Sequence, residues 1–122
     1  VQLQLGRAAL RMNQLEMAKL NLMAIVEDET AAPEDKLIAL VLTAGIEGAD
    51  LPAIARALEL GAHVLSVEGQ VEAHFSLYEA GAGDVHLTKA REAMATLRAG
   101  VLPQDQAAFD RVELYVRVSE GG

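Results

Sequence analysis

The 122-residue chain contains no cysteine, and this absence excludes disulfide bonds, zinc sites built from thiolates and cysteine nucleophiles. It decides nothing about the cellular compartment, because a chain without cysteine is compatible with any redox environment. Aromatic residues make up only 3% of the chain, although hydrophobic residues together reach 52%. Ala and Leu dominate this apolar material and favour helices over strands. The sequence also lacks Asn-Gly and Asp-Gly hairpin signals, so it predicts an all-α domain with a hydrophobic core.

Positive charge and long apolar runs are also scarce. Ten Lys and Arg residues against 18 Asp and Glu residues give a formal net charge of −8, which disfavours nucleic acid or anionic lipid as the main partner. The longest apolar run, Leu37 to Leu42, is far shorter than the roughly 20 residues that span a bilayer. We therefore expect no nucleic-acid binding and no membrane insertion. Because the chain starts at Val1 without Met, we expect it to be a segment of a longer protein.

Several residue types recur with a spacing of 36 residues. Leucine marks the spacing at positions 15, 51 and 87, and each of these leucines follows a polar or glycine-containing break. Small or apolar residues recur with the same spacing around these leucines. Ala8, Ala44 and Ala80 stand seven positions before them, Ala18, Ile54 and Ala90 three positions after, and Leu22, Leu58 and Met94 seven positions after. A fixed spacing of this length is typical of stacked helix hairpins.

Local signals predict about seven helices in this register. Asp50 is a plausible N-cap for the fourth helix and Asp84 for the sixth. The third helix is apolar on every face, so we place it in the middle of the stack. The seventh carries enough polar residues to act as a capping helix, and Glu120–Gly122 should be a frayed tail. The first expected helix ends at about Met12, the second covers 15–26 and the third 33–46. The fourth starts at 51 and the fifth covers about 70–80. The sixth covers 84–100 and the seventh 103–118.

The first hairpin resembles the tetratricopeptide repeat (TPR). Leu5-Gly6, with Ala18 twelve residues after the glycine, is similar to that motif, which has a Leu-Gly pair in its first helix and an Ala in its second. The similarity covers nearly the whole chain as one domain over 1–122. It comprises three degenerate repeats, approximately 1–32, 33–68 and 69–102, and a capping helix over 103–118. The resemblance implies antiparallel hairpins stacked as a short right-handed superhelix, with a concave groove that holds a peptide or partner helix.

The resemblance also implies which residues face that groove. Gln4, Arg7 and Arg11 stand at i, i+3 and i+7, which places them on one helix face. Two guanidiniums on that face could bind a partner carboxylate in a bidentate manner, and the alternative is an ordinary solvated face. Carried over by the 36-residue register, the groove positions are Gln4/Leu40/Ser76, Arg7/Thr43/Glu79 and Arg11/Glu47/Gly83, to which the seventh helix adds Val112 and Tyr115.

The polar residues form no recognisable catalytic or metal-binding pattern. His63, His74 and His86 are the only histidines, and no two of them stand at i and i+4, as a helical metal site requires. We expect all three to be structural or exposed. No serine lies in a Gly-x-Ser-x-Gly elbow. The sequence therefore predicts no metal, no cofactor and no enzymatic activity.

Two functions remain open at this point. The first is a protein–protein interaction module, an adaptor or scaffold that binds a peptide or partner helix in its groove. The second is a structural helical domain that self-associates or docks onto the rest of its own chain. This second function is suggested by the first helix, which would present Leu3, Leu5 and Leu10 at an open edge of the stack.

Overall fold

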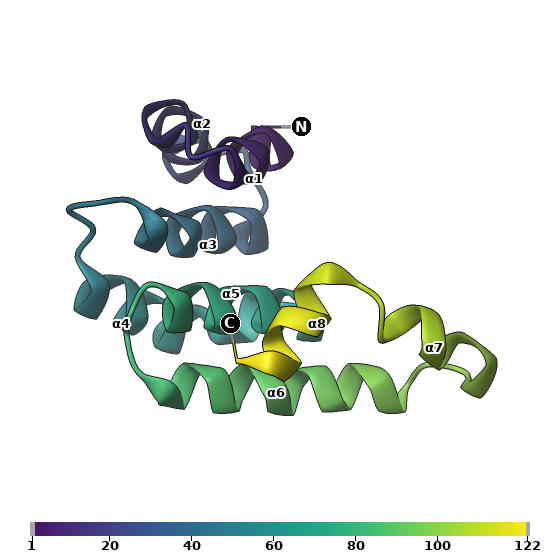
Figure 1. Cartoon of the computed structure of the whole chain (residues 1–122). Helices are drawn as coiled ribbons and strands as arrows, with labels where there is room; N and C mark the ends of the chain where they lie inside the picture. Colours follow the sequence, from purple (N-terminus) through teal and green to yellow (C-terminus); the bar gives the residue numbers. More distant parts are fainter. Residues whose placement is uncertain (1, 122) are drawn as a thin grey trace.

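The computed structural model describes residues 2–121, and every regular element in this range is helical (Figure 1). The predicted all-α class is confirmed, while the expectations about Val1 and Gly122 lie outside the described residues. No helix among those described is long and apolar enough to cross a membrane. The elements are α1 (Gln2–Arg11), α2 (Leu15–Glu27), α3 (Pro33–Leu42), η1 (Thr43–Gly45), α4 (Leu51–Gly61), η2 (Ala62–Val64), α5 (Val67–Glu79), α6 (Asp84–Ala99), η3 (Pro103–Asp105), α7 (Gln106–Phe109) and α8 (Glu113–Glu120).

Capping side chains explain where several helices start. The Asp50 carboxylate accepts a hydrogen bond from the Ala53 amide at 3.1 Å, so the predicted cap of α4 is confirmed. The Ser66 hydroxyl accepts one from the Gly69 amide at 3.0 Å, which starts α5 at Val67, three residues before the predicted position. The prediction that Asp84 caps α6 is wrong. Asp84 is the first residue of that helix, and the capping position is occupied by a glycine.

The predicted seventh helix over 103–118 is divided in two, and this division accounts for eight α-helices among the described residues. Val112 has extended backbone angles between α7 and α8, and the fold-back brings Phe109 onto Tyr115 with their rings 4.3 Å apart. The expectation of a frayed tail is also wrong as far as Gly121. This residue ends α8 with a positive φ of 80°, and its carbonyl accepts a 2.9 Å hydrogen bond from the Tyr78 hydroxyl.

The helices pack around two hydrophobic clusters that share α5. α1 packs on α2 and α3, α3 packs on α2, α4 and α5, and α6 packs on α5 and α8. The first cluster lies between α2, α3, α4 and α5, and its α5 members are Ala73 and Leu77. The second joins α5, α6 and α8 through Val71, Phe75, Ala90, Ala93 and Val118. Figure 1 shows α1 and α2 at one end of the molecule, α6 at the other and α8 beside α6.

The third helix, which we expected in the middle of a stack, packs on α1, α2, α4 and α5. Four of its residues are buried, namely Ile38, Ala39, Val41 and Leu42. They form one broad face of the helix, and the partly buried Leu37 and Leu40 beside this face also pack against the first cluster. α3 ends four residues before the predicted end, because the chain continues as the 3₁₀ turn η1.

Candidate interaction site

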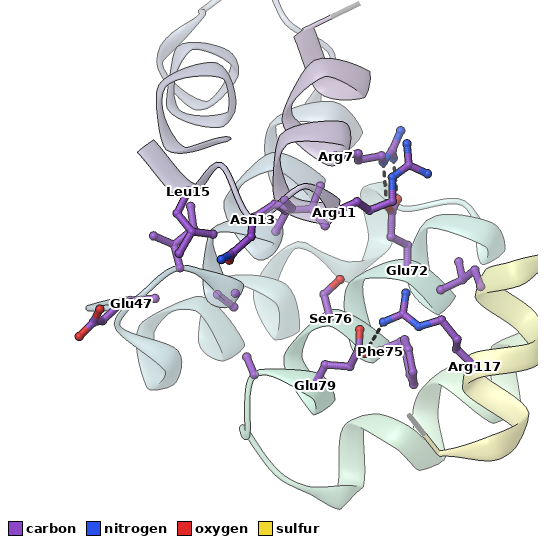
Figure 2. A pocket seen from close by; sticks show the side chains of 18 of the residues that line it. Arg7, Arg11, Asn13, Leu15, Glu47, Glu72, Phe75, Ser76, Glu79 and Arg117 are labelled. Atoms are coloured by element: carbon purple, nitrogen blue, oxygen red, sulfur yellow. Dashed lines mark hydrogen bonds and ion pairs between the residues drawn. The ribbon is translucent and has the colours of Figure 1, made fainter. Parts of the chain in front are cut away.

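An open hollow of about 760 Å³ lies between the end of α1, the α3–α4 connection, α5 and the start of α8 (Figure 2). We name it the central hollow. Each of its walls comes from a different part of the chain, so it exists only in the folded domain. Its apolar lining includes Leu10, Leu42, Ile46, Phe75, Val112 and Leu114.

Two ion pairs cross the central hollow and hold its walls together. Arg7 on α1 donates from Nε and Nη2 to the two carboxylate oxygens of Glu72 on α5, at 2.7 and 2.6 Å. Both side chains are about three-quarters buried, which favours this bidentate pair over an exposed one. Arg117 on α8 pairs with Glu79 on α5 and also lies over the Phe75 ring, 5.3 Å from its centroid. The Arg7 guanidinium, expected to face a partner, is thus held by the chain's own carboxylate.

Unpaired charges remain on the rim of the hollow. Arg11 and Glu47 are exposed, and neither makes a side-chain hydrogen bond or ion pair within residues 2–121. Figure 2 shows Arg11 beside Arg7, and Glu47 on the other side of the hollow. Glu113 at the start of α8 is likewise exposed and lines the hollow. The rim therefore offers a free cation at the α1 wall and free carboxylates at two other walls.

The structure brings together six of the eleven residues predicted to face the groove. Arg7, Arg11, Glu47, Ser76 and Glu79 all line the central hollow, as does Val112. The resemblance to the TPR motif, carried over by the 36-residue register, implies a groove surface at these positions.

The other five predicted residues lie elsewhere, and one of them, Gly83, is exposed at the start of α6. Leu40 and Thr43 line a second hollow of about 320 Å³ between α2, α3 and α4, and the Thr43 hydroxyl donates to the Leu40 carbonyl at 2.5 Å. Gln4 is exposed outside the central hollow. Tyr115 faces Phe109 and is half-buried, and burial raises the pKa of its hydroxyl.

Spacing in the sequence contains one further signal for the central hollow. Glu72, Ser76 and Glu79 stand at i, i+4 and i+7 on α5 and line the same wall. Helical periodicity could have added Glu72 to the two predicted residues. Phe75 and Arg117 carry no such signal, because their position depends on how α8 packs on α5.

Two of the three histidines meet across the α5–α6 contact. The Nδ1 atoms of His74 and His86 are 3.1 Å apart, and both side chains are buried, whereas His63 is exposed. Burial lowers the pKa of His74 to about 4, with additional effects of His86 and Lys89. Burial and Lys89 also lower the pKa of His86. Among the described residues, no group of three or more His, Cys, Asp or Glu side chains could hold a metal ion.

Comparisons with protein-family models, curated proteins and solved structures give no match for this chain. The central hollow is therefore the main guide to what the domain does.

Proposed function

We propose that this domain is a protein-interaction module, an adaptor or scaffold, which binds a peptide or a partner helix in the central hollow. The observation that supports the proposal is an open, apolar-lined hollow of about 760 Å³ with unpaired charges on its rim. Apolar pockets of this size accommodate several side chains, and a few charges around them orient the ligand. We assign no catalytic chemistry to the domain.

We further propose that the helices form three TPR-like hairpins, α1–α2, α3–α4 and α5–α6, with α8 as the capping helix. The first helices α1 and α3 contact each other, as do α3 and α5, in the order expected for stacked hairpins. The recurring column Ala18, Ile54 and Ala90 is buried in the second helix of each hairpin. Repeated burial at matched positions supports an internal repeat.

The rim charges suggest the chemistry of the partner. Arg11 favours an acidic side chain or carboxylate at the α1 wall, while Glu47 favours a basic side chain at the α3–α4 connection. Arg7 and Glu79 already have partners within the chain, so they contribute less to charge selection. The proposed ligand is a short segment with apolar side chains between one acidic and one basic end.

Selection from a displayed peptide library on the intact chain, followed by calorimetric titration, tests this proposal. Arg11→Ala should weaken a selected peptide about tenfold, or roughly 1.4 kcal/mol, because it removes an unpaired cation from the rim. Ser76→Tyr should weaken it by more than tenfold by filling the hollow from α5. Arg7→Ala is a poorer test, because it would also leave the Glu72 carboxylate without its partner.

Matched controls lie outside the central hollow. Arg56 is an exposed arginine on α4, and Thr96 is an exposed residue on α6. Arg56→Ala and Thr96→Tyr should leave the affinity within about twofold of the original chain. Affinity that survives both Arg11→Ala and Ser76→Tyr would contradict binding in the central hollow.

A second function, self-association, is favoured by a specific apolar surface on the first hairpin. Leu5, Met12, Met17 and Leu20 are between 52% and 74% exposed. Leu5 and Met12 stand seven residues apart on the α1 segment, and Met17 and Leu20 three apart on α2, so each pair shares a helix face. Leu3 and Leu10, which we expected at the open edge, instead pack partly buried against the first cluster.

Sedimentation equilibrium over a concentration series tests self-association. If the first hairpin mediates it, Leu20→Glu should shift the chain towards monomer, while Leu60→Glu should not. Leu60 is a suitable control because it is 70% exposed, close to the 74% of Leu20, and lies on α4. A monomer at all concentrations would exclude this second function.

A further inference from the structure

The His74–His86 contact joins the two helices that carry the second hydrophobic cluster. His74 lies on the face of α5 that packs on α6, and His86 lies in the first turn of α6. Their rings are nearly parallel, with centroids 5.4 Å apart and planes inclined by 23°. Only 9% and 8% of the two residues is exposed. Solvent therefore does little to compensate a charge placed on either ring.

The Nδ1···Nδ1 contact requires a particular proton arrangement. In the neutral pair, one ring donates its Nδ1–H and the other accepts with an unprotonated Nδ1. One added proton can enter at the Nε2 of the donor ring without breaking this bond. A second added proton must occupy the accepting Nδ1, which places two N–H groups and two positive charges against each other at 3.1 Å. Double protonation of the pair therefore disfavours the packed α5–α6 contact.

The surroundings of the pair do not offset added positive charge. Lys89 on α6 acts on both rings and is itself a cation. His86 lies at the positive end of the α6 dipole, which also disfavours an imidazolium, and the nearby Asp84 is exposed. α3, α4 and η1 also pack on α5, and within residues 2–121 none of them supplies a carboxylate bonded to either ring.

The parts of the molecule on either side of the pair are held by different contacts. α6 is attached to α5 through the second cluster. α8 lies across both helices. The Arg91 guanidinium of α6 donates to the Val118 and Ser119 carbonyls at 3.1 and 3.0 Å, and α5 holds α8 through the Arg117–Glu79 ion pair and the hydrogen bond from Tyr78 to the Gly121 carbonyl. The first cluster involves α2, α3 and α4 instead. Loss of the α5–α6 contact would therefore affect α6 and α8 before it affects α2–α4.

We propose that the His74–His86 pair is an acid-sensitive switch, which loosens α6 and α8 from α5 in mild acid while α2–α4 stay packed. Because α8 supplies one wall of the central hollow, its release would also lower the affinity for a partner, and this consequence alone rests on the proposed function.

The direction of the pH dependence follows from proton linkage. The pKa of both rings in the folded chain lies below the 6.5 of a free histidine, so the unfolded chain binds more protons than the folded chain in acid. The stability that the pair contributes is complete above about pH 6.5. It is lost as the pH falls towards 4, the approximate pKa of His74.

Amide hydrogen exchange of the free chain between pH 7 and pH 4, corrected for intrinsic exchange rates, tests this switch without any partner. Protection in α6 and α8 should fall by between about tenfold and a hundredfold for each pH unit below roughly 6, a factor of ten for each ring that gains its proton only on opening, and ahead of protection in α2 and α3. The double variant His74→Leu/His86→Leu should lose this difference, because it replaces both rings by apolar side chains that do not titrate. His63→Gln should keep the original profile, since that ring is exposed.

If the double variant does not fold, a second measurement on the original chain still tests the proposal. In the original chain, proton NMR should show that the two buried rings titrate over the same pH range in which α6 and α8 lose protection. The proposal is overturned if the double variant keeps the original acid profile. It is equally overturned if protection disappears at the same pH in all helices, or if the two rings titrate without any change in α6 and α8.

Discussion

Gly6 permits the closest approach between the first two helices. A Cβ atom at this position would lie 2.6 Å from Leu22 Cδ2 and 2.9 Å from Leu22 Cγ, and Leu22 is fully buried. The Leu22 side chain therefore has little room to move away. The glycine that carries the resemblance to the TPR motif has a packing role in this chain.

We predict that Gly6→Ala destabilises the fold by about 1–2 kcal/mol, because the overpacking against Leu22 exceeds the gain of up to about 1 kcal/mol in helix propensity. Urea unfolding followed by circular dichroism measures the change. Gly45→Ala is the matched control, since a Cβ at Gly45 meets nothing within 4 Å, and it should be neutral or slightly stabilising. Equal stability of the two variants would contradict a packing role for Gly6.

Individual rim residues could be predicted, but their partners could not. Periodicity correctly placed Arg7 and Arg11 on one helix face, and both line the central hollow. Nothing in the sequence indicates that Glu72, 65 residues away, pairs with Arg7 and leaves Arg11 unpaired. The difference between a structural arginine and an available one depends on tertiary packing.

At the scale of elements, α5 links the two halves of the domain. It contributes Ala73 and Leu77 to one hydrophobic cluster and Val71 and Phe75 to the other. Its remaining face carries Glu72, Ser76 and Glu79 towards the central hollow. Because α5 packs on several helices and also lines the hollow, a change in its packing should change the shape of the candidate site.

The Arg7–Glu72 pair is expected to attach α1 to α5. A double-mutant cycle with Arg7→Met and Glu72→Gln should give a coupling energy of about 1 kcal/mol, since the pair is bidentate and about three-quarters buried. Chemical unfolding of the four chains measures it. The exposed Arg98–Asp110 pair provides the comparison and should couple less strongly, because solvent screens both charges. A larger coupling for Arg98–Asp110 would contradict this ranking.

Helix positions were easier to predict than helix ends. Pro33 and the Asp50 cap carry their information locally, and α3 and α4 start where they indicate. The division between α7 and α8 has no comparable local signal. It follows from contacts that form only in the fold, namely Phe109 on Tyr115 and Val118 in the second cluster. The continuous helical pattern over 103–118 therefore did not indicate the break, which depends on tertiary packing.

At the scale of the whole molecule, the all-α class follows from composition, whereas the central hollow does not. Its four walls come from α1, the α3–α4 connection, α5 and α8. The 36-residue register related α1 to α5 well enough to place Arg7, Arg11, Ser76 and Glu79 together. It misplaced Leu40 and Thr43, which line the second hollow between α2, α3 and α4.

Amide chemical-shift mapping with a selected peptide decides whether partners bind in the central hollow. We predict that the largest shifts fall on Arg11, Glu47 and Ser76, which line three different walls. Ser76→Tyr should abolish these shifts while leaving the spectrum of the free chain folded. Shifts confined to the outer face of the first hairpin, around Met17 and Leu20, with none in the hollow, would contradict the proposed site.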